Sequence, residues 1–328
     1  MSGASDPSTG PTVVTMGEAM RLLVAEPGVA LQRATSFRSS IAGAESNVAI
    51  GLARMGFAVR WLSRVGGDAN GQSLLTQLRA ENIDVSAVEV DPDRPTGILM
   101  RDSHPTRGIT VQYLRSGSAA CGLSGSFVRQ RGLGGAHLVH FSGITPMLSP
   151  SASEATDVLL ELAECGGATV SFDPNVRLKL GDRQQWRETI RPILDRADVI
   201  FAGEDELEMI TGTSTEDAVA ALLTRGAASV VVKHADKSAT VHTNDGHWHH
   251  RPLAQAVVDT VGAGDALVAG YLGAWLRQAT PEAALFAGMV TAALVVGAST
   301  DIEGYPDQNE LARAAEAFTS GGEHHVDR

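Results

Sequence analysis

The stretch DTVGAGDALVAGYL, residues 259–272, decides the fold of this chain. Its first half is rich in glycine, and its second half places apolar residues at helical spacing without a proline. This pattern predicts a tight glycine turn that opens a buried helix. Such a turn leaves several backbone N–H groups unpaired at the positive end of the helix dipole, so we expect an anion site there.

Asp265 lies inside this expected anion site, where a carboxylate would hinder simple anion binding. A carboxylate is useful there if it takes a proton from a hydroxyl group while the N–H groups of Gly262, Ala263 and Gly264 stabilise charge on a phosphoryl group. The stretch therefore indicates phosphoryl transfer from a nucleotide to an alcohol, with Asp265 as general base. A G-x-G turn before a helix also serves as a plain packing turn, so the motif alone leaves both interpretations open.

The size and charge of the chain exclude several classes of protein. Its 328 residues, 43% of them hydrophobic, suffice for one large α/β domain or two ordinary ones. The chain has 26 Lys and Arg residues and 38 Asp and Glu residues, so its net charge is 26 − 38 = −12. This negative charge argues against a nucleic-acid partner or an anionic membrane surface. No apolar run has the length needed to span a bilayer, and the start of the chain lacks a signal-peptide pattern. We expect a cytoplasmic protein.

Short β-rich runs alternate with helical patterns along most of the chain. Such alternation predicts an α/β fold with a mostly parallel sheet covered by helices on both faces. The strands expected in this sheet are residues 12–16, 58–65, 138–141, 168–172, 199–201 and 230–232, followed by two more strands from residue 237.

Two segments, residues 20–40 and 96–115, break this alternation, because each looks like antiparallel strands with no helix between them. A turn at His104-Pro105 in the second segment predicts a hairpin. We expect the two segments to form a small β-sheet lid that keeps water from the site. The large domain would then comprise residues 12–19, 41–95 and 116–320, and residues 1–11 and 321–328 would be disordered tails.

Two long motifs carry a resemblance to a known family. AGAESNVAIGLARMG (residues 42–56), continued by RVGGDANGQSLLTQLRAENID (residues 64–84), resembles the N-terminal signature of the ribokinase-like (PfkB-type) carbohydrate kinases. Residues 259–272 resemble their C-terminal signature, and two signatures in the right order are far more specific than either alone. Within the family the chain is most similar to 2-keto-3-deoxygluconate kinases. The narrower match lies in GAESN (43–47), YLRSGSAA (113–120), SGITP (142–146) and DPNVR (173–177).

The resemblance implies a three-layer α/β/α sandwich with a mostly parallel central sheet and a small β-sheet lid. It also implies transfer of the ATP γ-phosphate, with Mg²⁺, to a hydroxyl of 2-keto-3-deoxygluconate, giving 2-keto-3-deoxy-6-phosphogluconate. Fructose, ribose, a nucleoside or 2-keto-3-deoxygalactonate stay open as other acceptors, as does a catalytically inactive nucleotide- or sugar-binding relative. A requirement for a monovalent cation and a homo-oligomer formed through the lid also stay open.

The sugar site implied by the resemblance combines residues from distant segments. These residues are Gly43, Asn47, Tyr113, Arg115, Ile144, Arg177 and Asp265. Tyr113 and Arg115 alternate on a predicted lid strand and so share a face. Two arginines directed at one crevice would recognise a carboxylate, which a sugar acid has and a neutral sugar lacks. Either arginine could instead be a solvated surface cation.

The implied nucleotide site uses Asn175 at the phosphates, Lys233 and Ala235 beside the nucleotide, and Gly262 with Gly264 as the anion hole. Glu206 resembles the glutamate that helps to hold Mg²⁺ through water in this family. As an acid in the first turn of a predicted helix, it would also favour the helix dipole.

The chain departs from the family pattern at several positions. Gly203 stands where the family has an asparagine three residues before the metal-linked glutamate, and Ala235 and Ser238 replace glycines of the loop after Lys233. Close relatives have aromatic residues near Leu99 and Leu114, so we expect a sugar pocket with fewer hydroxyl groups. These departures leave the nucleotide preference and the identity of the sugar open.

Overall fold

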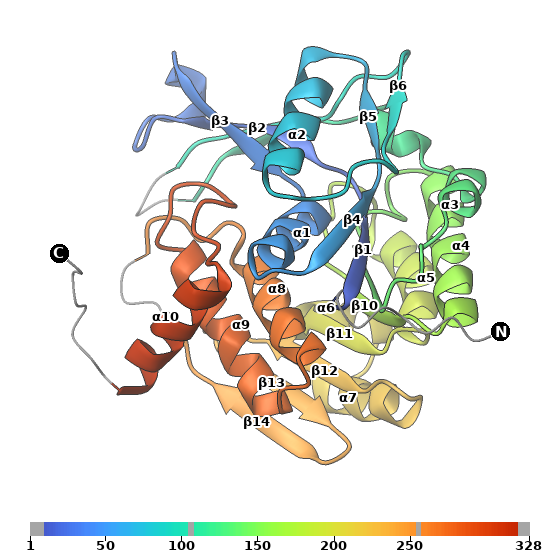
Figure 1. The fold of residues 1–328 in the computed structure, drawn as a ribbon, viewed down its shortest axis with the longest axis vertical. Helices are drawn as coiled ribbons and strands as arrows, with labels where there is room; N and C mark the ends of the chain where they lie inside the picture. The colour runs from blue at the N-terminus through green and yellow to red at the C-terminus, as the bar shows by residue number, and fades with distance from the viewer. Residues whose placement is uncertain (1–9, 104–107, 254–256, 321–328) are drawn as a thin grey trace.

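The computed structural model describes residues 10–103, 108–253 and 257–320, and within these ranges one large sheet runs through the centre of the protein (Figure 1). It has eight strands in the order β14-β13-β12-β11-β10-β9-β1-β4. The six from β12 to β4 are parallel, and β13 and β14 add an antiparallel hairpin at one edge. Their bounds are β1 Thr12–Met16, β4 Ala58–Leu62, β9 Leu138–Ser142, β10 Thr169–Asp173, β11 Val199–Gly203, β12 Ser229–Lys233, β13 Ala239–Thr243 and β14 Gly246–His250.

Helices cover both faces of this sheet, and the alternation of side chains along each strand explains why. In β1, Val13 belongs to one apolar cluster and Val14 to another, because successive side chains point to opposite faces. The first cluster includes side chains of α1 Ala44–Arg54, α2 Ala69–Ala80, α8 Ala263–Leu276 and α9 Pro281–Val295, with α10 Gln308–Ser320 packed outside. The second includes side chains of α3 Gly125–Arg131, α4 Pro150–Gly166, α5 Arg183–Leu194, α6 Glu204–Thr211 and α7 Thr215–Thr224. The predicted three-layer α/β/α sandwich is confirmed.

A small four-stranded sheet stands beside the large one (Figure 1). Its order is β3 (Phe37–Ala42), β2 (Met20–Ala25), β7 (Ile98–Arg101) and β8 (Val111–Leu114). Strands β2 and β3 pair antiparallel, as do β7 and β8, whereas β2 and β7 run parallel. The predicted turn at His104-Pro105 lies outside the described residues.

The structure corrects several expected element bounds. The predicted strand over residues 58–65 divides into β4 and β5 (Arg64–Gly66), and β5 pairs with β6 (Glu89–Asp91), which the sequence pattern did not predict. Helix α3 was also not predicted. Residues 1–9 and 321–328 of the expected tails are outside the described residues, and the domain boundaries stay a prediction. None of the helices within the described ranges has both the length and the apolar character needed to cross a bilayer.

Helices α1 and α8 pack closely because a glycine lies between them. A Cβ atom on Gly51 of α1 would come within 2.6 Å of the Tyr305 ring and 2.7 Å of the Ala269 Cβ of α8. Separations this short do not occur, so any larger residue would push the two helices apart.

We expect Gly51→Ala to lower the free energy of unfolding by about 1–3 kcal/mol, because overpacking outweighs the gain in helix propensity. Gly166→Ala is the matched control, since Gly166 is also helical but has open space around its Cβ position. Urea denaturation followed by circular dichroism measures both changes. An equal stability of Gly51→Ala and the wild type would contradict the packing argument.

Candidate active site

A cavity of about 450 Å³ opens where the small sheet meets the carboxyl ends of the central strands and the N-termini of α1 and α8. Twelve of the residues predicted for the sugar, nucleotide and catalytic sites line it: Gly43, Asn47, Tyr113, Arg115, Ile144, Asn175, Arg177, Glu206, Lys233, Gly262, Gly264 and Asp265. Ala263 lines a neighbouring cavity instead, and the exposed Ala235 lines neither. The structure thus brings together residues that are more than 200 positions apart in the chain.

The glycine turn before α8 presents free amides to this cavity. Gly262 has a left-handed conformation with φ 86°, which glycine adopts without strain. Within the described chain, the N–H groups of Gly264 and Asp265 donate to no acceptor. A Cβ atom on Gly264 would meet nothing within 4 Å, so the space in front of the turn is open. The turn is therefore shaped to receive a negatively charged group.

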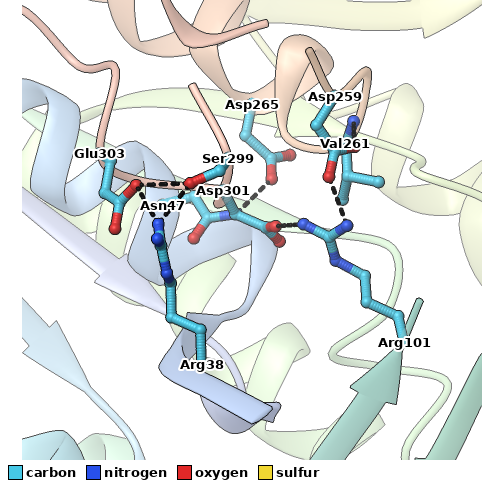
Figure 2. Close-up of polar contacts among 9 residues, drawn as sticks. All are labelled: Arg38, Asn47, Arg101, Asp259, Val261, Asp265, Ser299, Asp301 and Glu303. Carbon is cyan, nitrogen blue, oxygen red and sulfur yellow. Dashed lines mark hydrogen bonds and ion pairs between the residues drawn. The ribbon is translucent and has the colours of Figure 1, made fainter. Parts of the chain in front are cut away.

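Asp265 occupies the first turn of α8 and is held by two asparagines. Asn47 Nδ2 of α1 donates to Oδ2 of Asp265 at 2.8 Å, and Asn175 Nδ2 lies 3.5 Å from its Oδ1 (Figure 2 shows the Asn47 bond). Burial raises the pKa of Asp265 to about 7; the Asn47 bond lowers it, and the negative charge of Asp173 adds to the rise. A carboxyl group with a pKa near neutrality is suited to exchange protons with a bound hydroxyl.

Asn175 reaches Asp265 because of an unusual backbone conformation. Its φ is 44°, in the left-handed region that asparagine enters more readily than most residues. The N–H of Asn175 donates to Oδ1 of Asp173 at 3.0 Å, which closes a turn directly after β10. The resemblance implies a place for Asn175 at the nucleotide phosphates, which stays a prediction; in the structure its amide also lies beside the carboxyl group of Asp265.

Lys233, at the end of β12, is paired with Asp173 at the end of β10. Its Nζ lies 2.7 Å from Oδ2 of Asp173. Burial opposes protonation of this ammonium group, but the carboxylates of Asp173 and Glu206 outweigh burial and raise the pKa of Lys233. The lysine therefore supplies a permanent positive charge at the cavity wall.

Glu206 fixes the backbone of two loops. Its Oε1 accepts the N–H of Val176 at 2.7 Å, and its Oε2 accepts the N–H of Gly203 at 2.7 Å. The second bond satisfies an N–H at the start of α6, as expected of an acid in a first helical turn. Each oxygen retains a further lone pair, so this carboxylate could also accept a hydrogen bond from metal-bound water.

The two arginines that line the cavity, Arg115 and Arg177, differ in their partners. Arg115 forms an ion pair with the buried carboxylate of Glu18 and lies 5.7 Å from the ring centroid of Tyr113. The hydrogen bond found for Arg177 within the described residues runs to the carbonyl of Val176, 2.9 Å away, and Arg177 forms no ion pair there. Arg177 is exposed, and its positive charge acts to lower the pKa of Asp265 against the larger rise caused by burial; of these two arginines it is the one with no ion pair in the described chain.

Glu18 lines the cavity but was not predicted as a site residue, although its position after a buried strand indicated one. It follows the buried strand β1 at the carboxyl edge of the sheet, where α/β folds bind ligands. Its Oε1 accepts the hydroxyl hydrogen of Ser118 at 2.5 Å.

The motifs GAESN and SGITP meet at the buried Glu45. Its Oε1 accepts bonds from the Ser142 hydroxyl at 2.6 Å and the Thr145 hydroxyl at 2.8 Å. A Cβ atom on Gly43 would lie 2.3 Å from the Glu18 carbonyl oxygen. The packing of the protein therefore requires a glycine at position 43 even when no ligand is bound. Both motifs contribute residues to the wall of the cavity, Ile144 among them.

The structure corrects one expectation about the sugar pocket. Leu99 lines the cavity and is buried, but Leu114 is 50% exposed and does not line it. The expectation that Leu114 removes a hydroxyl group from the pocket is wrong, because alternation along β8 turns Leu114 away from Tyr113.

A second, more apolar cavity of about 400 Å³ adjoins the first and shares Lys233, Thr260 and Gly264 with it. Its wall consists mainly of aliphatic side chains, among them Leu253, Leu267, Met289, Ala292 and Val296. The two cavities thus meet across the glycine turn, the polar one on the side of Asp265 and the apolar one between α8 and α9.

Comparison with known proteins agrees with this architecture. The model of the pfkB family of carbohydrate kinases matches residues 11–308. A 2-dehydro-3-deoxygluconokinase of Bacillus subtilis (strain 168) is 36% identical over 91% of this chain and 94% of its own length. Relatives at lower identity are named 2-dehydro-3-deoxygalactonokinase, from Haloferax volcanii, and probable fructokinase-7, from Arabidopsis thaliana.

Solved structures give the same result. The crystal structure of a PfkB protein from Polaromonas sp. JS666 superposes with a TM-score of 0.82 at 34% identity, over 92% of this chain and 99% of that one. A fructokinase from Vibrio cholerae O395, solved with fructose, ADP and potassium ion, superposes with a TM-score of 0.82 at 26% identity, over 94% of this chain and 99% of that one. The chain therefore belongs to the pfkB family and is a carbohydrate kinase.

Proposed function

We propose that this carbohydrate kinase transfers the γ-phosphate of ATP to a hydroxyl of 2-keto-3-deoxygluconate, which is the same compound as 2-dehydro-3-deoxygluconate. The product is 2-keto-3-deoxy-6-phosphogluconate. The observation that carries the proposal is one cavity that holds Asp265, with a pKa of about 7, in front of free amides, together with the available guanidinium group of Arg177. The name of the Bacillus subtilis relative supports this choice of sugar.

The two adjoining cavities fit a nucleotide and an acceptor. An adenine ring would suit the apolar cavity between α8 and α9, which has no charged wall residue other than Lys233 and Lys237 within the described chain. The phosphates would then cross the glycine turn beside Lys233 and reach the polar cavity. Ala235 is exposed, so the departure from glycine at this position leaves the cavity wall unchanged.

Asp265 would act on the acceptor hydroxyl. It takes the proton while the hydroxyl oxygen forms a bond to the γ-phosphorus and the bond from that phosphorus to the ADP oxygen breaks. The N–H groups of Gly264 and Asp265 stabilise the charge on the transferred group. Asn47 and Asn175 hold the carboxyl group in place, so that it does not turn toward these amides itself.

Carboxylates near the phosphate path fit a hard cation. Mg²⁺ bound to the phosphates would neutralise charge, and it binds proteins through one or two carboxylates and several waters. Glu206 would hold it through water, since both of its oxygens already accept backbone N–H groups.

Arg177 favours an acidic acceptor. Arg115 already pairs with Glu18, so its charge is largely compensated before any ligand binds. A carboxylate entering the cavity would find Arg177 in no ion pair with the described residues, although its charge already acts on Asp265, and could form charge-assisted hydrogen bonds with it. A neutral sugar such as fructose remains the second candidate, because one sequence relative is named probable fructokinase-7 and a solved fructokinase structure has the same fold.

Turnover on a panel of acceptors tests the proposal directly. With ATP and Mg²⁺, we expect ADP release with 2-keto-3-deoxygluconate to exceed that with fructose, ribose and 2-keto-3-deoxygalactonate. Asp265→Asn should lower kcat by about 10²–10⁴-fold, the usual contribution of a general base, while ADP binding changes little. Turnover on neutral sugars alone would refute the sugar-acid assignment, and no turnover on any acceptor would favour a binding protein.

The raised pKa of Asp265 predicts opposite effects of pH on activity and stability. The rate constant kcat/KM should rise with pH through about 7, because the base must be deprotonated. The stability that the protonated carboxyl contributes is fully present below about pH 4, the unfolded pKa, and is lost as the pH rises to about 7. The melting temperature of Asp265→Asn minus that of the wild type should therefore increase from pH 4 to pH 8. A difference in melting temperature that stays constant with pH would contradict the raised pKa of Asp265. Asp93→Asn, at an exposed position, is the control.

Replacing Arg177 separates acidic from neutral acceptors. We expect Arg177→Gln to raise KM for the sugar acid by about tenfold, the equivalent of one charge-assisted hydrogen bond, and to leave KM for fructose within about twofold. Arg183→Gln is the matched control, because Arg183 is exposed nearby but does not line the cavity. Equal effects of Arg177→Gln on both acceptors would show that Arg177 does not read the carboxylate.

A further inference from the structure

The guanidinium group of Arg101 joins two carboxylates that flank the glycine turn. Arg101 is the last residue of β7 in the small sheet, and its side chain is only 1% exposed. Its Nη1 pairs with Oδ2 of Asp259, and its Nη2 lies 3.0 Å from Oδ1 of Asp301 (Figure 2). Both carboxylates are buried as well, so the three side chains form an enclosed ion triad.

Each carboxylate of the triad belongs to a residue that supports the turn. Oδ1 of Asp259 accepts the N–H of Val261 at 3.0 Å, which fixes the backbone just before Gly262. The carbonyl oxygen of Asp301 lies 3.0 Å from the position of a Cβ atom on Gly262, so the turn rests on the backbone of Asp301. A movement of either aspartate would therefore move the free amides of the turn.

The triad also changes the charge around the anion site. Asp259, Asp301 and Asp265 all lie near the place where a phosphoryl group would arrive, and together they would repel it. Arg101 compensates one of these charges from within the protein. Buried ion triads add little net stability compared with apolar residues of the same shape, so a general stabilising role does not account for its presence at this turn.

A second arginine of the small sheet provides a contrast. Arg38 of β3 lies 2.5 Å from Oγ of Ser299 and 3.5 Å from Oε2 of Glu303, in the same segment as Asp301 (Figure 2). Its side chain is 60% exposed, so this contact contributes little.

We propose that Arg101 is a positioning residue that fastens the small sheet to the glycine turn and thereby holds the amides of the turn in their phosphate-binding geometry. This inference rests on the proposed function, which assigns the turn to phosphoryl transfer. It makes the geometry of the anion site depend on the docked position of the small sheet.

Arg101→Ala tests the proposal, with Arg38→Ala as the matched control. We expect Arg101→Ala to lower kcat by about 100-fold, the effect of a displacement near 1 Å, and to leave KM for the acceptor within about threefold. Guanidinium chloride, added far below the concentration that unfolds the wild type, should restore about tenfold of the loss, because the ion can enter the vacated space. Arg38→Ala should keep wild-type kcat. A folded Arg101→Ala variant with nearly normal kcat, or with no recovery by guanidinium, overturns the proposal.

Arg101→Lys covers the case in which Arg101→Ala does not fold. Lysine keeps the charge but cannot donate to both carboxylates in the fork geometry of a guanidinium group. We expect a folded variant with a kcat loss of about tenfold, since one of two charge-assisted contacts is lost. An unchanged kcat would overturn the proposal.

A binding measurement separates this inference from the proposed function. Calorimetry with ADP and beryllium fluoride, a mimic of the γ-phosphoryl group, needs no acceptor. If the wild type turns over no acceptor, the proposed function fails, but the calorimetric measurement still tests the positioning role of Arg101. Loss of about tenfold in affinity for the mimic in Arg101→Ala, with ADP affinity unchanged, supports the positioning role. Equal affinities of the variant and the wild type refute it.

Discussion

The placement of one carboxyl group at the mouth of a helix is the constraint on which the rest of the structure depends. Asp265 lies where the dipole of α8 and two free amides favour negative charge, so its own carboxylate competes with any phosphate for these groups. The bond from Asn47 holds Oδ2 on the side of α1, away from this competition. That bond requires α1 to lie against α8, which Gly51 permits. Close helix packing in the core thus serves a polar contact in the cavity.

Because the chain is acidic, the pairing of its basic side chains near the cavity determines which of them can attract an anionic ligand. Three basic side chains around the cavity are already paired with acids: Lys233 with Asp173, Arg115 with Glu18, and Arg101 with Asp259 and Asp301. Each of them compensates a carboxylate that the fold has buried, so none is free to attract a ligand at full strength. Under the proposed function, selectivity for an acidic acceptor would therefore depend more on Arg177, which lines the cavity and forms no ion pair among the described residues, than on Arg115.

The sequence predicted the fold and most of the cavity because those features follow from local patterns. Alternating strands and helices gave the three layers, and the glycine turn before an apolar helix gave the position of Asp265. The sequence could not show partners that come from distant segments. Arg115 looked free because Glu18, its partner, lies 97 positions earlier, and Arg101 was overlooked because its aspartates lie 158 and 200 positions later. Leu114 was misplaced for a smaller reason: the same alternation that put Tyr113 and Arg115 on one face of β8 turns Leu114 to the other face, and the prediction for Leu114 did not take this into account.

The motif DPNVR, residues 173–177, connects several walls of the cavity through one short loop. Asp173 binds the ammonium group of Lys233 at the end of β12, and Asn175 contacts Asp265 of α8. Val176 is held by Glu206, which leaves Arg177 directed at the cavity. Asp173, Asn175 and Val176 are each bonded to a different element, so the backbone of the loop is held at three points. Under the proposed function, an acceptor that required a shift of this backbone would also disturb Asn175, which contacts the proposed general base. If Arg177 binds the charged group of the acceptor as proposed, this coupling would favour acceptors whose charged group lies at a fixed distance from the reacting hydroxyl.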